Sequence, residues 1–501
     1  MNLIATRRLV IVAASLVGAL MIGWDVAHGS LFLPSLAVIA LLLGLVPLLA
    51  GMWADAFFGG ILLVGYLVGN RGFAQLNAPG IPLLPGEAML GIALALIAWR
   101  SARHQSLPFR RDAINYLVLM WIIIGAARIP FDFRHHGLVA VRDFAMIYYA
   151  LFFFIAQVWA TQTQERRWLQ NCLAVGFALC GPIFYVFDQR QEWFTSNLSI
   201  AGVPLIFVKS DVAGGFMAAA IPWFVYRYAG SRRLGWLALA GLALACAVAS
   251  NSRAAVVAFL VGVLWLIVLR AWRMLGGIAV LIAAGCLALG THAIADRRPL
   301  TATPLYRLYE SVASVADFGG TRQYLTANLA DKPDNNQFRL VWWRALIDET
   351  WASSRWLGLG FGRDLAAEFL RVYYADANEE FSARSPHNFM LTVFGRMGLV
   401  GVSIVLALLG AMAFMTWRAG KRLPFAARTM GSLPLWLAAW AVLTSACFGV
   451  VLEGPMGAVV FWTLLGLANA VADGETAVVQ DAPAVEAPFP RPVHDVAPAR
   501  C

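Results

Sequence analysis

The feature that most restricts this chain is a succession of long apolar runs. Residues 31–49, 254–269 and 400–415 are examples, and each approaches the roughly 20 residues that cross a bilayer as a helix. Hydrophobic residues make up 60% of the 501 positions and charged residues 13%, which is more apolar surface than a water-soluble domain could bury. Because unpaired backbone groups are costly in hydrocarbon and the alternation of a lipid-facing barrel is absent, we expect helical spans.

Counting these runs by length predicts an all-α polytopic integral membrane protein with about 14 transmembrane helices. With Arg7 and Arg8 on the cytoplasmic side, the short breaks on that side carry 17 lysines and arginines. The opposite breaks carry seven outside one large loop. This excess follows the positive-inside rule, so the net charge of +10 reflects topology and nucleic acid is not an expected partner.

The same threading predicts three parts. Residues 1–210 form N-terminal transmembrane helices, and residues 211–472 form a core that includes a large, mainly helical outer loop at 293–386. Residues 473–501 are rich in Ala, Pro and Val and predict a disordered cytoplasmic tail. Five of the six cysteines fall inside predicted spans and the sixth is the last residue, so no disulfide framework is expected.

One candidate site lies at residues 384–389, Arg-Ser-Pro-His-Asn-Phe, ahead of glycines that recur every three residues. Pro386 fits a helix start, and Gly395, Gly398 and Gly401 would admit a neighbouring helix. His387 then lies at the outer mouth of a span, where it could take a proton near neutral pH. The alternative is an interfacial histidine that only hydrogen-bonds loop backbone.

A second candidate is Arg253, which follows Ser250-Asn251-Ser252 at an outer turn between two spans. Its guanidinium could bind the phosphates of a lipid diphosphate with two parallel hydrogen bonds. The alternative is an arginine that reaches out of the bilayer to a headgroup phosphate.

The third candidate is a helix over residues 335–347, followed by the glycine-rich turn 357–362. Its asparagines could cap the helix start, and one face is apolar through Phe338, Val341, Trp342 and Leu346. We expect the helix to lie along the outer leaflet with its tryptophans at headgroup depth. Arg339 or Arg344 could then point into a site, or both could simply meet lipid.

Other outer charges are ambiguous. Arg142 and Asp143 could form an interfacial ion pair, and Asp211 and Glu453 could complete a polar cavity or cap helices. His135 and His136 are adjacent and would diverge on a helix, so no metal site is predicted.

These signals, taken in order, resemble the core of the bacterial O-antigen ligase and polymerase family. The resemblance covers residues 211–465 and includes the closing Glu-Gly-Pro segment at 453–455. It implies a metal-independent, inverting glycosyltransferase without a cofactor, located in the bacterial inner membrane with its active site facing the periplasm. The donor would be a glycan on undecaprenyl diphosphate.

Carried onto this chain, the resemblance makes His387 the base or the positioner of the acceptor hydroxyl. Arg253 and Arg339 would stabilise the leaving diphosphate, and Arg344 could replace Arg339 if the helix were turned differently. The remaining substrate-binding candidates are Asn388, Arg384, Asp211 and Glu453.

The acceptor stays open among lipid A core for a ligase, another lipid-linked glycan for a polymerase, and a protein hydroxyl. About 14 spans, counted by length, are more typical of O-antigen or exopolysaccharide polymerases. A lipid-linked oligosaccharide flippase is the alternative from another class, although a transporter has little use for a large outer subdomain. Besides donor and acceptor, membrane lipids are expected partners.

Overall fold

The computed structural model describes residues 53–77, 83–104, 109–200, 202–250, 252–295, 332–373, 384–421 and 431–480, together with single positions between 301 and 317. The predicted spans centred near residues 14 and 39 lie outside these ranges, as do residues 481–501 of the predicted tail. The five cysteines inside predicted spans are all free.

The described residues are almost entirely helical, with one two-residue antiparallel strand pair that the all-α prediction did not include. The elements in chain order are α3 (Ala54–Ala74), α4 (Pro85–His104), α5 (Ala113–His136), α6 (Leu138–Asp143), α7 (Ala145–Tyr148), α8 (Leu151–Trp159), α9 (Thr163–Gln189), α10 (Gln191–Asn197), β1 (Ser199–Ile200), β2 (Val203–Pro204), α11 (Ser210–Ser231), α12 (Leu234–Ala249), α13 (Arg253–Val268), α14 (Trp272–Ala295), α17 (Lys332–Ser354), α18 (Ala367–Tyr373), α19 (Phe389–Lys421), α20 (Leu433–Ala446) and α21 (Pro455–Gln480).

Helix α11 is the centre of the bundle and packs against α9, α12, α13, α14 and α20. Small residues make this possible. A Cβ on Gly214 would lie 2.8 Å from Ser252 Oγ of the α13 cap, and one on Gly215 would lie 2.7 Å from Ser445 Cβ of α20. Glycine therefore lets two helices approach α11 closely near its start.

Four described helices are long and apolar enough to cross a membrane: α3, α5, α9 and α19. A fifth span is formed if α6–α7 and α8, which are bent by 41°, are counted as one. Helices α12, α13, α20 and parts of α14 and α21 are apolar but shorter. The helical membrane architecture thus agrees with the sequence, whereas the count of about 14 stays a prediction.

Helix α19 is broken at Gly398, which has φ 62° and ψ −156°. The backbone of residues 355–360 fills the break: Leu359 N donates to Gly395 O at 2.6 Å, and Leu399 N donates to Arg355 O at 2.8 Å. The prediction that these glycines admit a neighbouring helix is therefore wrong for Gly398. The neighbour there is the glycine-rich turn, whose backbone takes up the hydrogen bonds that the broken helix releases.

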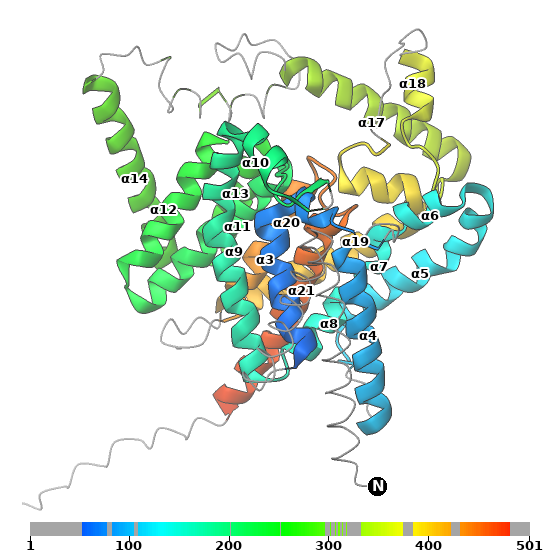
Figure 1. Cartoon of the computed structure of the whole chain (residues 1–501), viewed down its shortest axis with the longest axis horizontal. Coiled ribbons are helices and arrows are strands. Elements are labelled where there is room, and N and C mark those ends of the chain that lie inside the picture. Colours follow the sequence, from blue (N-terminus) through cyan, green and yellow to red (C-terminus); the bar gives the residue numbers. More distant parts are fainter. Residues whose placement is uncertain are drawn as a thin grey trace, which may run out of the picture.

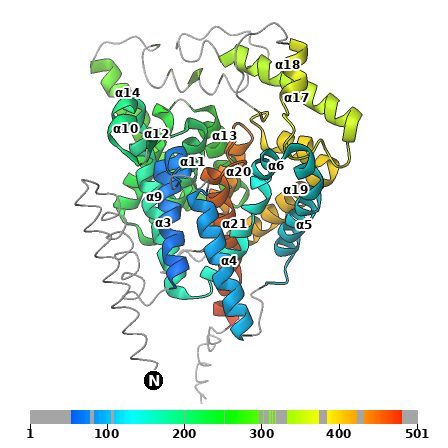
Figure 2. The ribbon, with the colours of Figure 1, turned by 45° about the vertical axis from the view of Figure 1, so that its right-hand side comes forward.

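Helices α17 and α18 lie across one end of the bundle, the end that also carries α10 (Figures 1 and 2). Helix α21 descends toward the opposite end, where its helix continues to Gln480, past the predicted start of the tail at Asp473.

The apolar face predicted for residues 335–347 is buried, but against protein. Trp342 is 1% exposed and stacks on Phe369 of α18, with ring centroids 5.6 Å apart. Trp343 donates from Nε1 to Pro386 O at 2.8 Å. Trp342 thus packs on α18 and Trp343 hydrogen-bonds the histidine loop, whereas their position at headgroup depth stays a prediction. The helix also begins at Lys332, before the asparagines that were expected to cap it.

Candidate functional site

His387 lies in a bend immediately before α19, in the left-handed region with φ 54°. Its ring packs edge-on against Trp342, with ring centroids 6.1 Å apart. Burial, and then the positive charges of Arg339 and Lys209, together lower the pKa of His387 to about 4 against the opposing effect of Asp211. The imidazole is therefore neutral at pH 7 and can accept a proton.

Asn388 holds the bend in place. Its Oδ1 accepts hydrogen bonds from Met390 N at 3.1 Å and Leu391 N at 3.3 Å. This is N-capping, so Asn388, and not Pro386, sets the start of α19. The side-chain oxygen proposed to bind substrate is occupied by the helix.

Arg339 extends from α17 to the loop between α20 and α21, where it donates to Phe448 O at 3.1 Å. Burial lowers its pKa and the neighbouring Asp211 carboxylate raises it. Arg344, the alternative loop arginine, is 88% exposed and lies 3.9 Å from Asp348 on its own helix. The structure thus places Arg339, and not Arg344, beside His387.

Asp211 is in the first turn of α11, where its Oδ1 accepts from Val212 N at 2.9 Å. A Cβ on Gly449 would collide with its carboxylate, so Asp211 also touches the segment to which Arg339 bonds. Arg253 is the first residue of α13, and the preceding cap residue Ser252 contacts α11 at Gly214. Gly214 lies one helical turn after Asp211 on α11. His387, Arg339, Asp211 and Arg253 are therefore gathered at one end of α11.

Glu453 does not line this group directly. It is half-buried, and its Oε1 accepts from Ser385 Oγ at 2.6 Å and Thr392 Oγ1 at 2.9 Å. Burial raises its pKa, while these two hydroxyls and the Arg396 guanidinium oppose that rise. Because Ser385 and Thr392 flank His387, Glu453 ties both sides of the histidine bend to the start of α21.

Arg384 belongs to a separate network beneath the bend. It donates to Gly362 O at 2.7 Å and lies 3.9 Å from the Asp143 carboxylate, which pairs with Arg396 at 2.8 Å. Asp143 also accepts from Gly362 N at 2.9 Å. Asp143 therefore pairs with arginines of the histidine loop and α19, not with Arg142 as one interpretation of the sequence had it.

The glycine-rich turn is anchored in this network. Gly358, Gly360 and Gly362 all have positive φ, at 72°, 95° and 92°, a conformation that glycine adopts without strain. Asp132 accepts from Phe361 N at 2.7 Å, and Arg128 donates to the Leu357 and Gly358 carbonyls. The turn thus fixes α17 to α5 and α6.

A groove of about 430 Å³ runs between α17 and the start of α19. Arg344 and Asn388 are its polar residues, and its apolar lining is Leu340, Trp343, Ile347, Met390, Leu391 and Cys447. It adjoins the histidine bend through Asn388.

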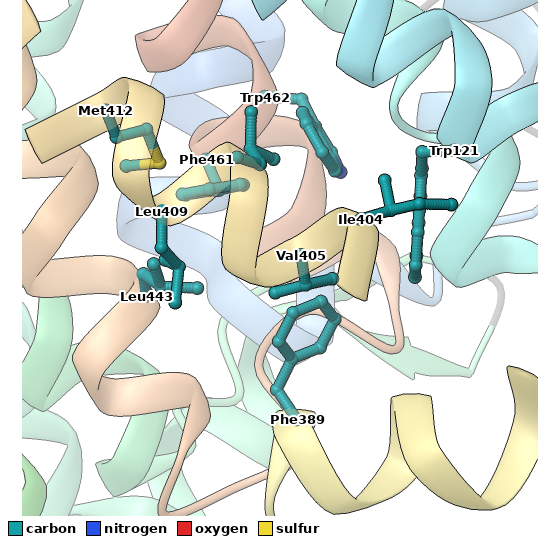
Figure 3. Close-up of a pocket in the computed structure, with 10 residues that line it drawn as sticks. Trp121, Phe389, Ile404, Val405, Leu409, Met412, Leu443, Phe461 and Trp462 are labelled. Carbon is teal, nitrogen blue, oxygen red and sulfur yellow. The ribbon is translucent and has the colours of Figure 1, made fainter. Parts of the chain in front are cut away.

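A second cavity, of about 10 Å³, lies deeper and is wholly apolar. Figure 3 shows Phe389 below it, Trp121 at one side and Phe461 and Trp462 above, around the second half of α19. It is too small and too apolar to bind a sugar or a phosphate, and it belongs to the core.

Within the described ranges, no group of three or more His, Cys, Asp or Glu side chains lies together in a way that could hold a metal ion. His135 bonds the Phe131 carbonyl of its own helix at 2.9 Å. Sequence reasoning missed Lys209, which it treated only as an outer positive charge. Lys209 is recognised only in the folded structure, where its positive charge lowers the pKa of His387.

Comparison with known proteins gives one family match: residues 237–406 match the model of a family described as O-antigen ligase. No curated protein matches the chain. The matched segment contains Arg253, Arg339 and His387. The family points to membrane glycan transfer of the O-antigen ligase type. Residues 237–406 therefore match the O-antigen ligase family, and this match supports the resemblance to the O-antigen ligase and polymerase family that the sequence motifs indicated.

Proposed function

We propose that this protein transfers a glycan from an undecaprenyl-diphosphate donor onto an acceptor hydroxyl. The observation that carries the proposal is a half-buried, neutral His387 beside the Arg339 guanidinium. A proton acceptor next to a fixed positive charge suits a reaction that removes a proton from the nucleophile and creates negative charge on the leaving group.

In the proposed step, the acceptor oxygen attacks the anomeric carbon while His387 takes the hydroxyl proton. The bond between that carbon and the phosphate oxygen breaks, and its electron pair leaves with the diphosphate. Attack opposite the breaking bond inverts the anomeric centre. Arg339 and Arg253 stabilise the charge on the diphosphate, and this needs no divalent cation. The Asp211 carboxylate interacts favourably with the Arg339 guanidinium and opposes the lowering of the arginine pKa by burial.

Binding of the anionic donor would also make His387 a better general base. Arg339 and Lys209 lower the pKa of His387 in the free protein. A diphosphate bound beside Arg339 would offset positive charge and raise the histidine pKa toward the working pH, where general bases are most effective. Donor binding would therefore prepare His387 for the acceptor.

We further propose that the site faces the periplasm. Helices α17 and α18 lie at the end of the bundle opposite the lower end of α21 (Figure 1), and the positive-inside bias supports a cytoplasmic position for that lower end. In this arrangement about 14 helices span the inner membrane, residues 293–386 form the periplasmic loop, residues 211–472 form the catalytic core after the N-terminal helices of 1–210, and the tail after 473 is cytoplasmic.

The groove between α17 and α19 suits the lipid part of a substrate. Its lining is apolar apart from Arg344 and Asn388, so it could hold the first isoprene units of the donor while the diphosphate lies near Arg339. The acceptor would then approach from the remaining side, whether it is lipid A core, as in a ligase, or a second lipid-linked glycan, as in a polymerase.

The test uses the purified protein in proteoliposomes with a lipid-linked glycan donor and candidate acceptors. His387→Ala should abolish product formation while the protein stays folded. His135→Ala is the matched control, because His135 is exposed and bonds only its own helix. Normal product from His387→Ala would refute the proposal, and donor translocation without any product from the unaltered protein would favour a flippase.

A further inference from the structure

Helix α3 breaks near its end at Asn70, which has φ 53° and ψ −121°. Such a conformation is strained for any residue except glycine, and strain of this kind is kept where the surroundings make use of it. Asn70 is completely buried. Beyond the break, Gly72 N donates to Phe207 O at 3.1 Å, and Phe207 N donates to Gly69 O at 3.2 Å.

The Asn70 side chain connects this break to the segment before α11. Its Oδ1 accepts from Lys209 N at 3.2 Å, across 139 residues of sequence, and from Arg71 N at 2.9 Å. The segment from Phe207 to Lys209 is thus fixed at both ends, by the broken end of α3 and by the start of α11. Lys209 is held two residues from Asp211, which lies beside Arg339.

Lys209 lies within electrostatic reach of the histidine, since its charge lowers the pKa of His387. The charged groups that act on His387 are Arg339, Lys209 and Asp211. Two of these three groups are cations, and Arg253 begins α13 at the same end of α11. A diphosphate carries enough negative charge to compensate several cations at once.

We propose that Lys209 binds the diphosphate of the donor and that Asn70 is the positioning residue that holds Lys209 at the site. The inference rests on the proposed function, because it assigns part of the donor site. Neither residue lies in the matched family segment 237–406. A lysine ammonium acts as a point charge and can serve either phosphate, while the arginines supply directed pairs of hydrogen bonds.

The primary test is binding of undecaprenyl diphosphate and undecaprenyl monophosphate to the purified full-length protein. Lys209→Met should weaken diphosphate binding by about tenfold or more, as expected for loss of a charge-assisted contact, and should weaken monophosphate binding less. Lys209→Arg should restore most of the affinity. Arg190→Met is the control, because Arg190 is an exposed cation that ends α9.

The variant Asn70→Gly distinguishes the proposed positioning of Lys209 by Asn70 from an effect of the backbone strain at Asn70. Glycine adopts the φ of 53° readily, so the break in α3 should survive while the bond to Lys209 N is lost. If Asn70 positions Lys209, this variant should raise the KM for donor severalfold and leave kcat nearly unchanged. If Asn70 were only a structural residue, relief of its strain would leave KM unaltered and stabilise the fold.

A second readout is the pH profile of kcat/KM. Removing the positive charge in Lys209→Met should move the acid limb to higher pH, because one of the two cations that depress the pKa of His387 is gone. Lys209→Gln serves the same purpose if the methionine variant does not fold. Unchanged diphosphate affinity and an unchanged acid limb in a folded, active variant would overturn the inference. Because His387→Ala would still be inactive, the proposed glycan transfer would stand.

Discussion

At the scale of single residues, burial determines what His387 can do. An imidazole in water has a pKa near 6.5 and is partly protonated at neutral pH. In the folded chain the pKa falls to about 4, first through burial and then through Arg339 and Lys209. The protein thus keeps its proposed base neutral, and the Asp211 carboxylate only partly offsets this effect.

The pH dependence follows from the sign of that shift. His387 is neutral above its folded pKa and becomes protonated below it, so activity that needs the neutral form is lost as the pH falls through about 4. Because kcat/KM reports the free enzyme, we expect its His387-dependent acid limb near pH 4, well below 6.5. An acid limb near pH 6.5 in the reconstituted protein would show that the imidazole is not buried as described.

The two loop arginines provide a matched pair. Arg339 is half-buried and donates to Phe448 O, whereas Arg344 is exposed on the same helix. Arg339→Lys should lower kcat by about 100-fold, the scale of losing one fixed donor to a developing charge, because a point charge does not reproduce the planar guanidinium. Arg344→Lys should stay within about threefold of the unaltered enzyme, on the scale of weak exposed charge contacts. Equal losses would contradict the placement of Arg339 in the site.

At the scale of elements, two broken helices hold segments that lead to the site. Helix α19 is broken at Gly398, and the glycine-rich turn packs into that break. Helix α3 is broken at Asn70, and the segment before α11 hydrogen-bonds to the backbone there. Each break releases backbone donors and acceptors that a distant segment satisfies. Within a membrane, irregular backbone of this kind is tolerated where protein surrounds it, and such breaks occur at functional sites.

Gly398→Ala tests the first break. A Cβ there would lie 2.5 Å from Trp356 C and O, at a φ that L-residues avoid. We expect a loss of more than about 2 kcal/mol in stability from strain and backbone collision, with a clear drop in melting temperature and in activity. Gly410→Ala, in the same helix with nothing within 4 Å of its added Cβ, should be neutral or slightly stabilising. Similar melting temperatures for both variants would mean that the turn does not fill the break.

The sequence predicted many of the residues in this arrangement, but not the contacts that hold them in position. Motif order pointed to His387 and Arg339, which the structure brings together, and the glycine spacing marked Gly358, Gly360 and Gly362 as a turn. The same glycine pattern at Gly398 was interpreted as helix packing, since a helix contact and a loop contact need the same small residue. Lys209 was overlooked because its anchor, Asn70, is 139 residues away and neither belongs to a recognisable motif.

At the scale of the whole molecule, the proposal depends on sidedness. Helices α17 and α18 lie at one end of the bundle (Figures 1 and 2). Helix α17 contacts the histidine bend through Trp343, which donates to Pro386 O, and Arg339 of α17 interacts with Asp211 at the start of α11. Charge bias supports that end of the bundle as periplasmic. A donor carried in the outer leaflet could then reach the groove beside Asn388 from within the membrane.

Cysteine labelling in intact cells tests this orientation. In a variant without native cysteines, Arg344→Cys should react with a membrane-impermeant maleimide, because that side chain is 88% exposed at the proposed periplasmic end. Ser231→Cys, exposed at the end of α11, should react only after the membrane is opened. The reverse pattern would place the site in the cytoplasm and rule out a periplasmic transferase.

The convergence of His387, Arg253 and Arg339 on one diphosphate is tested most directly by a cryo-electron microscopy structure with undecaprenyl diphosphate bound. We expect the diphosphate at the start of α11, within hydrogen-bonding distance of the Arg339 and Arg253 guanidinium groups, with the anomeric side facing the His387 ring. A diphosphate bound elsewhere, with His387 and Arg339 both remote from it, would contradict the proposed chemistry.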